Sequence, residues 1–392
     1  MCACLARPIR AQPIVPSGYE ALVAAGKLVL PGENGSPSTT EMDLTPAENL
    51  RRQRLAVARN APALKLVRET LKSPIDATSN SLQTDLGTSS FGKIRELARQ
   101  FRQESDVRAA DEDWVGAVDS HLTIIEMGTA MTHGAAYIGM LVGVSVDSMA
   151  LKNISPAAGH LDASASRRAL QRLREIEESR PEFADITKVE KLVSLRLAAQ
   201  TFGDRKLQEE WRKELADPET RRESGMTEAQ AAEFLAMSPE QIEAEIASLF
   251  DAAIKRDTLS YARAKPVILP AAKALLESTA QILTNSRMRF NFERDVAAQR
   301  LFAGALELHA IKLETGKYPE KFEAPLDPFA DDQRLVYKRK GDSYLLYSVG
   351  PDGRDNDGSA IQTIDTDNET GVKKISDRLM PESTGDIIAP VF

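Results

Sequence analysis

Cysteine and aromatic residues are scarce in this chain of 392 residues. The two cysteines, Cys2 and Cys4, are separated by one residue, which is poor geometry for a disulfide between them. The fold therefore depends on no internal disulfide, and this leaves the redox compartment open. Aromatic residues make up 5% of the chain, whereas alanine, leucine, glutamate and arginine are plentiful. That composition predicts helices that pack through aliphatic side chains.

An excess of positive charge is also missing, because the formal net charge is −8. A general nucleic-acid binder needs a basic face that displaces counterions, so we expect no nucleic-acid partner. Two basic runs exist, at 51–54 and 167–174, and each is interleaved with acidic residues or followed by them. Both runs are typical of solvated helix faces.

Long hydrophobic runs are limited to residues 124–146, which are mostly apolar and small. The run contains Glu126 and His133 and has no flanking basic belt, so it predicts a buried core helix in preference to a membrane span. The N-terminus has no apolar stretch of the kind that a secretory signal needs. Either the protein is cytoplasmic, or the sequence starts after a lost signal or anchor. A membrane contact is expected only through such an anchor.

Three regions follow from the local signals. Residues 1–45 are rich in proline, glycine, serine and threonine, which predicts an irregular N-terminal segment with one short helix-like patch at 19–27. Residues 46–290 show apolar residues at helical spacing and are expected to form an all-helical domain. Residues 291–392 combine a helix with strand patterns and are expected to form a small α+β module. The fold class predicted is therefore mostly α, with a multi-helical body and a small C-terminal module.

Capping and proline signals refine this division. Thr45, Pro46 and Glu48 match an N-cap, a first-turn proline and a capping box, so a helix should begin there. Residues 259–286 continue the helical pattern, although Pro266 and Pro270 should kink or divide that helix.

The C-terminal module starts with an apolar-periodic helix at 291–313, which Gly316 ends. Residues 334–338 and 343–349 read as strands, and the turn residues between them predict an antiparallel hairpin. A single hairpin is marginal in water, so the helix is expected to cover one of its faces.

Three short motifs in this module carry a resemblance to a known family. They are Gly316-Lys317-Tyr318-Pro319, Leu326-Asp327-Pro328-Phe329 and Tyr347-Ser348-Val349-Gly350-Pro351-Asp352-Gly353. Their order and spacing resemble the globular part of the major pseudopilin of type II secretion systems, over residues 295–361, although the family more often has tryptophan at position 329. The family's apolar assembly helix is not found next to this module. The resemblance therefore implies a pseudopilin-like head on a helical body, as in uncharacterised bacterial envelope proteins, and not a polymerising pilin.

An acidic loop follows the last predicted strand of the hairpin. Asp352, Asp355 and Asp357 lie within six residues, and glycines on both sides allow the backbone to fold tightly. Calcium prefers six to eight oxygen ligands, and close carboxylates repel one another unless a cation neutralises them. In the pseudopilin family the corresponding loop binds calcium, so the resemblance implies a structural calcium ion held by Asp352 together with Asp355 or Asp357. The candidate metal ligands are therefore Asp352, Asp355 and Asp357. Asp365 and Asp367 are weaker candidates, and a solvated acidic turn is the alternative.

Recognisable catalytic patterns are missing. The four histidines do not form an HExxH motif, and the chain has neither a phosphate-binding glycine loop nor a nucleophile elbow. We therefore expect a non-enzymatic protein of the periplasm or cell envelope, a structural or protein-binding helical scaffold with a calcium-stabilised pseudopilin-like head. A protein partner or self-association is expected. The alternatives are a hydrolase-type enzyme with an acidic active site in the helical body, and a cytoplasmic helical adaptor without metal.

Overall fold

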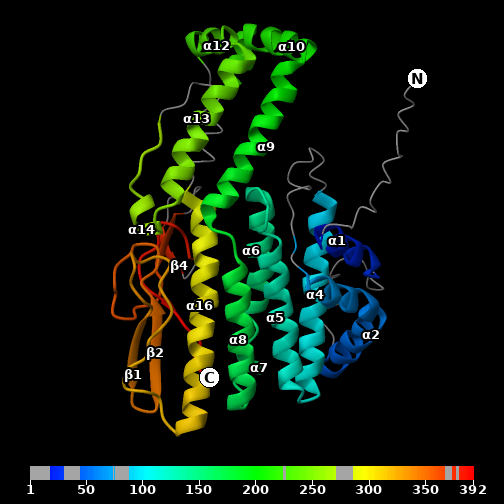
Figure 1. The fold of residues 1–392 in the computed structure, drawn as a ribbon, viewed down its shortest axis with the longest axis vertical. Coiled ribbons are helices and arrows are strands. Elements are labelled where there is room, and N and C mark those ends of the chain that lie inside the picture. The colour runs from blue at the N-terminus through cyan, green and yellow to red at the C-terminus, as the bar shows by residue number, and fades with distance from the viewer. Residues whose placement is uncertain are drawn as a thin grey trace, which may run out of the picture.

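The computed structural model describes residues 18–30, 45–73, 75, 88–223, 227–270, 286–366, 373–376 and 379–392. Within these residues the chain is mostly helical, and a small antiparallel sheet lies near the C-terminus (Figure 1). The predicted mostly α class, with a helical body and a small strand-containing portion, is confirmed at this level.

The first part of the described chain is a bundle of helices that lie side by side (Figure 1). Leu64, Leu97 and Phe101 are among the fully buried side chains of its apolar core. The helices are α1 (Gly18–Leu28), α2 (Pro46–Thr70), α4 (Thr88–Ala110), α5 (Trp114–Ala130), α6 (Tyr137–Leu151), α7 (Ser155–Ala158) and α8 (Ala163–Ser179).

The start predicted for the second of these helices is confirmed. Thr45 Oγ1 accepts a hydrogen bond from the backbone N–H of Glu48 at 3.3 Å, and Glu48 Oε2 accepts one from the backbone N–H of Thr45 at 2.9 Å. This reciprocal pair satisfies two donors that the first turn of α2 leaves without helical partners.

The apolar run at 124–146 belongs to two helices, α5 and α6, which are separated near Gly134, a residue with φ of +64°. Ile124, Ile125 and Met140 are fully buried, so the predicted burial of this run is confirmed. Among the described residues, no helix combines the length and the apolar character that crossing a membrane requires.

A two-helix arm extends beyond the bundle (Figure 1). It consists of α9 (Phe183–Gly203) and α13 (Pro239–Asp257), which pack against each other. Three short helices, α10 (Arg205–Ala216), α11 (Pro218–Glu223) and α12 (Glu228–Leu235), lie across its tip (Figure 1). Phe202, Trp211 and Phe234 hold the tip together, with ring centroids 5.7–6.1 Å apart. Such aromatic pairs add stability beyond the area that they bury.

The helix predicted over 259–286 is wrong for the part that the structure describes. Only the single turn α14 (Tyr261–Ala264) is helical there, and 265–270 continue without helix. Pro266 and Pro270 have no N–H to donate and clash with the preceding helical turn, so their effect is larger than a kink. Residues 271–285 lie outside the described residues.

The helix α16 (Ser286–Thr315) links the body to the C-terminal portion. It packs against α8 and α6, and also against the sheet, so it serves both parts (Figure 1). Gly304 permits this close approach, because a Cβ atom at that position would lie 2.7 Å from Leu346 Cδ2. The predicted helical cover of the hairpin is therefore found.

The sheet itself has the strand order β1-β2-β5 and is antiparallel. β1 (Val336–Lys340) and β2 (Ser343–Ser348) form the predicted hairpin, with Val336 opposite Tyr347. The sequence did not predict the third strand, β5 (Ile387–Ile388), which pairs with β2. A separate antiparallel pair, β3 (Thr363–Thr366) and β4 (Lys373–Ser376), was not predicted either.

The basic run at 167–174 lies on a partly exposed helix face, as predicted, and it also bridges helices. Arg172 pairs with Asp119 at 2.6 Å and with Glu126 at 2.7 Å, both on α5. On the other side of α8, Arg174 pairs with Glu307 of α16 at 2.7 Å. Together these ion pairs connect α5, α8 and α16.

Candidate functional site

The three predicted calcium ligands lie in the turn after β2, and each accepts hydrogen bonds from a different protein group. Asp352 Oδ1 accepts one from the backbone N–H of Arg354 at 3.0 Å. Asp355 Oδ1 accepts one from Tyr347 Oη at 2.7 Å, which lowers the pKa of Asp355. Asp357 has φ of +59° and accepts a hydrogen bond from Lys338 Nζ at 3.0 Å.

The same turn folds over a fourth carboxylate that the sequence did not reveal. Asp386 is 1% exposed and accepts hydrogen bonds from the backbone N–H groups of Asn356 at 3.3 Å and Gly358 at 2.7 Å. Burial raises the pKa of Asp386, and the charges of Asp355 and Asp352 raise it further. Asp386 is about thirty residues from the turn along the chain, so no local spacing could have predicted it.

The fit to a calcium ion depends on oxygens other than these carboxylates. Among the residues that the structure describes, no three histidine, cysteine or acidic side chains converge closely enough to hold a metal. Asn356 Oδ1 is buried and accepts no hydrogen bond from a described residue, so it is one further oxygen for a cation. Backbone carbonyls and waters would have to supply the rest. Calcium at Asp352, Asp355 and Asp357 stays a prediction. The side chain of Asp365, together with Asp367, lies outside what the structure describes.

The carboxylate of Asp327 joins two of the three sequence motifs, the loop at 326–329 and the segment at 347–353. Its carboxylate accepts hydrogen bonds from Phe329 N–H at 3.0 Å, from Ser348 Oγ at 2.8 Å and from Val349 N–H at 2.8 Å. Burial raises the pKa of Asp327, while these hydrogen bonds favour its charged form. The carboxylate thus fastens the loop at 326–329 to the end of β2. This role is structural.

Aromatic contacts join the same loop to the base of the arm. Phe329 is fully buried and contacts the edge of the Tyr261 ring at a centroid distance of 5.0 Å and an interplanar angle of 88°. Phe290 at the start of α16 lies 6.1 Å from Phe329 on the other side. The head, the arm base and α16 therefore share one apolar cluster.

A buried ion network lies where the bundle meets the arm. Arg180, in the connection between α8 and α9, pairs with Asp147 of α6 at 3.1 Å and with Asp295 of α16 at 2.9 Å. The three side chains are at most 4% exposed. Gln299 Nε2 donates to Asp147 at 3.0 Å and to Asp295 at 3.2 Å, and Arg180 also donates to Thr129 of α5 at 3.1 Å. Three helices, α5, α6 and α16, and the α8–α9 connection thus share one polar network.

Burial decides the protonation of this network. It raises the pKa of Asp147 well above its usual range, and the neighbouring charge of Asp295 adds to the effect. Burial also raises the pKa of Asp295, against the charge of Arg180. Burial lowers the pKa of Arg180, but the charges of Asp295 and Asp147 raise it above its usual value. Burial thus raises the pKa of both carboxyl groups, and the charge of Arg180 opposes the shift in each.

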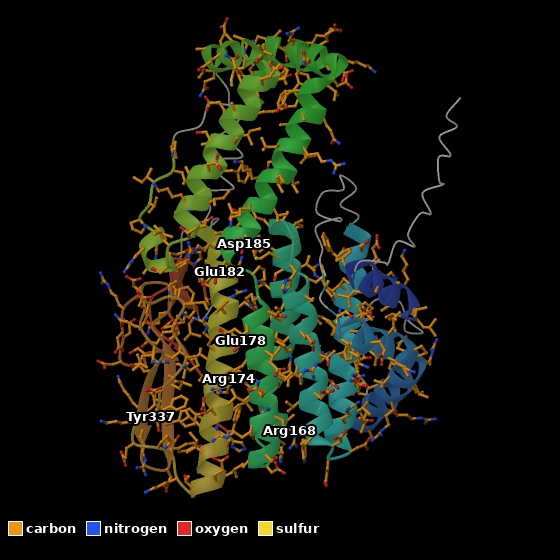
Figure 2. The ribbon with its side chains drawn as sticks, in the orientation of Figure 1. Arg168, Arg174, Glu178, Glu182, Asp185 and Tyr337 are labelled. Atoms are coloured by element: carbon orange, nitrogen blue, oxygen red, sulfur yellow. The ribbon has the colours of Figure 1, made fainter. Side chains whose placement is uncertain are left out.

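A pocket of about 290 Å³ lies beside the network, at the base of the arm. The α8–α9 connection, α13, α14, α16 and the loop at 326–332 all contribute to its walls. Figure 2 shows Glu182 at this connection and Asp185 at the start of α9. Within the pocket, Arg289 Nε donates to Glu293 Oε1 at 3.1 Å, and burial raises the pKa of Glu293 to about 7. Tyr261, whose pKa burial raises to about 12, also lines the pocket.

This pocket has the components of an acid–base site. A carboxyl group that titrates near pH 7 can both accept and donate a proton, and an adjacent guanidinium can hold an anionic group. Glu293 and Arg289 stand four apart on α16, which is the ordinary spacing of a helical ion pair. The sequence therefore gave no reason to separate them from other such pairs.

Comparisons with known proteins leave the chain unassigned. No family model, no curated protein and no solved structure matches it. The function has to be argued from the geometry described above.

Proposed function

We propose that this chain is a non-enzymatic, protein-binding helical scaffold of the bacterial cell envelope, with a pseudopilin-like head that calcium stabilises. The observation that carries the proposal is the arm of α9 and α13, which extends beyond the bundle and carries three short helices across its tip (Figure 1). An extended hairpin of this kind adds surface that the core of the bundle does not need. Such surface is suited to contact with a partner.

The surface of the arm supports this role. Leu192 and Leu197 of α9 are 52% and 43% exposed, and Leu207 of α10 is 36% exposed. The buried face of α13, with Ile242 and Ile246, is meanwhile committed to the seam with α9. These side chains supply apolar contact area on the outside of the arm.

The connection between arm and head supports a scaffold in particular. The ion network around Arg180 fixes the base of the arm to α6 and α16. The contact between Tyr261 and Phe329 fixes the same base to the head. A partner on the arm would therefore be held at a set position relative to the head.

Photo-crosslinking in cells tests the partner. A photoreactive residue would replace Leu197 or Leu207 on the arm, and Leu55 of α2, which is 59% exposed, is the matched control. We expect one discrete adduct from the arm positions and none from position 55. Equal adducts from all three positions, or none from the arm, would contradict a binding role for the arm.

Thermal melting tests the calcium. An ion that binds only the folded head raises stability by RT ln(1 + [Ca²⁺]/Kd). We expect a higher melting midpoint in calcium than in chelator, and we expect Asp352→Ala to remove the difference. An unchanged midpoint in the unsubstituted protein would leave the acidic turn as a solvated loop held by Asp386.

A second candidate function, a hydrolase-type enzyme, is favoured by one observation. Glu293 has a pKa of about 7 in a pocket that also contains Arg289 and Tyr261. The test is hydrolysis of simple ester, phosphoester and peptide substrates by the protein and by Glu293→Gln. Turnover that the substitution abolishes, with the fold retained, would favour the enzyme over the scaffold. Absence of turnover in both proteins would remove this candidate.

A further inference from the structure

A long groove runs between α6 and α16 on the outside of the ion network. Two adjoining cavities form it, with volumes of about 750 Å³ and 630 Å³. They share Ser148, Lys152, Asn291 and Arg294 as lining residues, so they make one continuous space. One end reaches residues 379–381 of the C-terminal portion, and the other end reaches α4. We call this space the basic groove.

Positive charge dominates the lining of the basic groove. Its five cationic side chains are Arg99, Arg102, Lys152, Arg287 and Arg294. The acidic residue in its lining is Asp295, whose side chain is 3% exposed and bound to Arg180. The whole chain carries a net charge of −8, so this concentration of cations is contrary to the average surface.

Three of the five cations form no close ion pair with a described residue, whereas Arg287 takes part in a further interaction. Arg99 pairs with Glu96 at 2.6 Å. Arg102, Lys152 and Arg294, by contrast, form no ion pair with any residue that the structure describes. The carboxylates of Asp106 and Asp295 interact with Arg102 and Arg294, respectively, through their charges without forming close ion pairs with them. Cations that lie close together repel one another, and the repulsion is relieved when an anion binds among them.

Arg294 is the most informative of these side chains. Its guanidinium lies 5.9 Å from the centre of the Phe290 ring, and burial lowers its pKa. The charge of the neighbouring Asp295, whose carboxylate is bound to Arg180, offsets part of this cost of burial. The fold nevertheless places Arg294 in the wall of the basic groove, next to Lys152. A bound anion would offset the cost.

The remaining lining residues define the kind of anion. Ser145, Ser148 and Asn291 can form hydrogen bonds, while Val144, Met149 and Phe290 supply apolar wall. Cavities of this size suit small organic ligands. Several arginine and lysine side chains along one wall suit phosphate, whose oxygens accept from many donors at once. We propose that the basic groove binds a small organic phosphate that carries at least two negative charges. This proposal does not depend on the scaffold function.

Isothermal titration calorimetry at low ionic strength tests the proposal, with a nucleoside diphosphate, inorganic pyrophosphate and citrate as probes. We expect saturable binding of one nucleoside diphosphate per chain, weaker binding of pyrophosphate and none of citrate. Added salt should weaken the binding, because it screens exposed charges. Lys152→Gln combined with Arg294→Gln should raise Kd at least about tenfold, because each change removes a charged hydrogen-bond donor.

The matched control is Arg212→Gln combined with Lys213→Gln, which removes the same two charges from an exposed part of α10. We expect this control to change Kd less than about twofold, since those charges lie outside the groove. The single variant Lys152→Gln, at an exposed position, repeats the test if the double variant fails to fold. No saturable binding of either phosphate probe would overturn the proposal. Equal losses in the groove and control variants, or citrate binding as tightly as the diphosphate, would also overturn it.

Discussion

Two neighbouring residues of α16 belong to opposite electrostatic environments. Asp295 is buried in the ion network, where Arg180 and Gln299 contact its carboxylate at 2.9 Å and 3.2 Å. Arg294 lines the basic groove, where no carboxylate of a described residue pairs with it. One helix therefore separates a carboxylate that forms a buried ion pair from a guanidinium that forms no close ion pair with a described residue.

The difference separates structural charges from ligand-binding charges. A buried ion pair is costly to break, since removing one partner leaves the other charge dehydrated and unpaired. A cation without a partner contributes little to folding, and the protein can lose it at low cost. Substitutions on the two sides of α16 should therefore change the free energy of unfolding by different amounts, and even in opposite directions.

The largest effect should come from Arg180→Ala. The change leaves Asp147 and Asp295 buried without their cation, and we expect a loss of about 3–5 kcal/mol in the free energy of unfolding. Urea denaturation followed by circular dichroism measures it. Arg174→Ala is the control, because Arg174 is 47% exposed in its pair with Glu307 and should cost at most about 1 kcal/mol. Similar losses of unfolding free energy in the two variants would mean that the buried ion network is no more important for stability than an exposed ion pair.

The pH dependence of stability should reveal the raised pKa of Glu293. Its folded-state pKa of about 7 is raised above the ordinary 4.5, so the proton is held more tightly in the folded protein. The stability from this group is complete below pH 4.5 and is lost as the pH rises towards 7, by up to about 3 kcal/mol. Asp147 and Asp295 act in the same direction, because burial raises the pKa of each.

Glu293→Gln should flatten the decline between pH 4.5 and 7, as measured by urea denaturation at several pH values. Glu175→Gln, on the exposed face of α8, is the control and should leave the decline unchanged. If Glu293→Gln and the unsubstituted protein decline in parallel, the raised pKa of Glu293 is refuted.

A smaller loss is expected from Gly128→Ala beside the network. A Cβ atom at position 128 would lie 1.7 Å from Asp147 Oδ1 and 2.7 Å from the carbonyl oxygen of Gly143. Relieving that overlap should cost about 1–3 kcal/mol in chemical denaturation. Gly92→Ala in α4 is a control with the opposite sign, because its Cβ would meet no atom within 4 Å. Alanine there should stabilise the helix by about 0.5–1 kcal/mol. Two losses of equal size would show that crowding against Asp147 is not the cause.

Features of the fold that depend on neighbouring residues were predictable from the sequence. Contacts between residues far apart in the sequence were not. The Thr45–Glu48 cap and the β1–β2 hairpin depend on residues within a few positions of each other, so short patterns identify them. The effect of Pro266 and Pro270 on the chain was underestimated, because the predicted helix does not continue there. β5 pairs with β2 across about forty residues, and no short pattern carries that information.

The candidate sites follow the same division. The acidic turn at Asp352, Asp355 and Asp357 was visible in the sequence, but its partner Asp386 was not. Asp147 and Asp295 are separated by most of the helical body, and Arg180 lies between them in the sequence. In the sequence each looked like an ordinary charged residue at the end or the side of a helix. Only tertiary packing brings them together.

The smallest effect on stability should come from Arg294→Gln, and it decides whether the comparison holds. Arg294 forms no close ion pair with a described residue, and burial lowers its pKa against the opposing charge of Asp295. Replacing it by a neutral side chain removes a partly dehydrated charge, so we expect a change between zero and a gain of about 0.5 kcal/mol in urea denaturation. A loss as large as that of Arg180→Ala would make Arg294 part of the structural network. In that case the basic groove would not be a separate site, and its phosphate chemistry would have to be abandoned together with it.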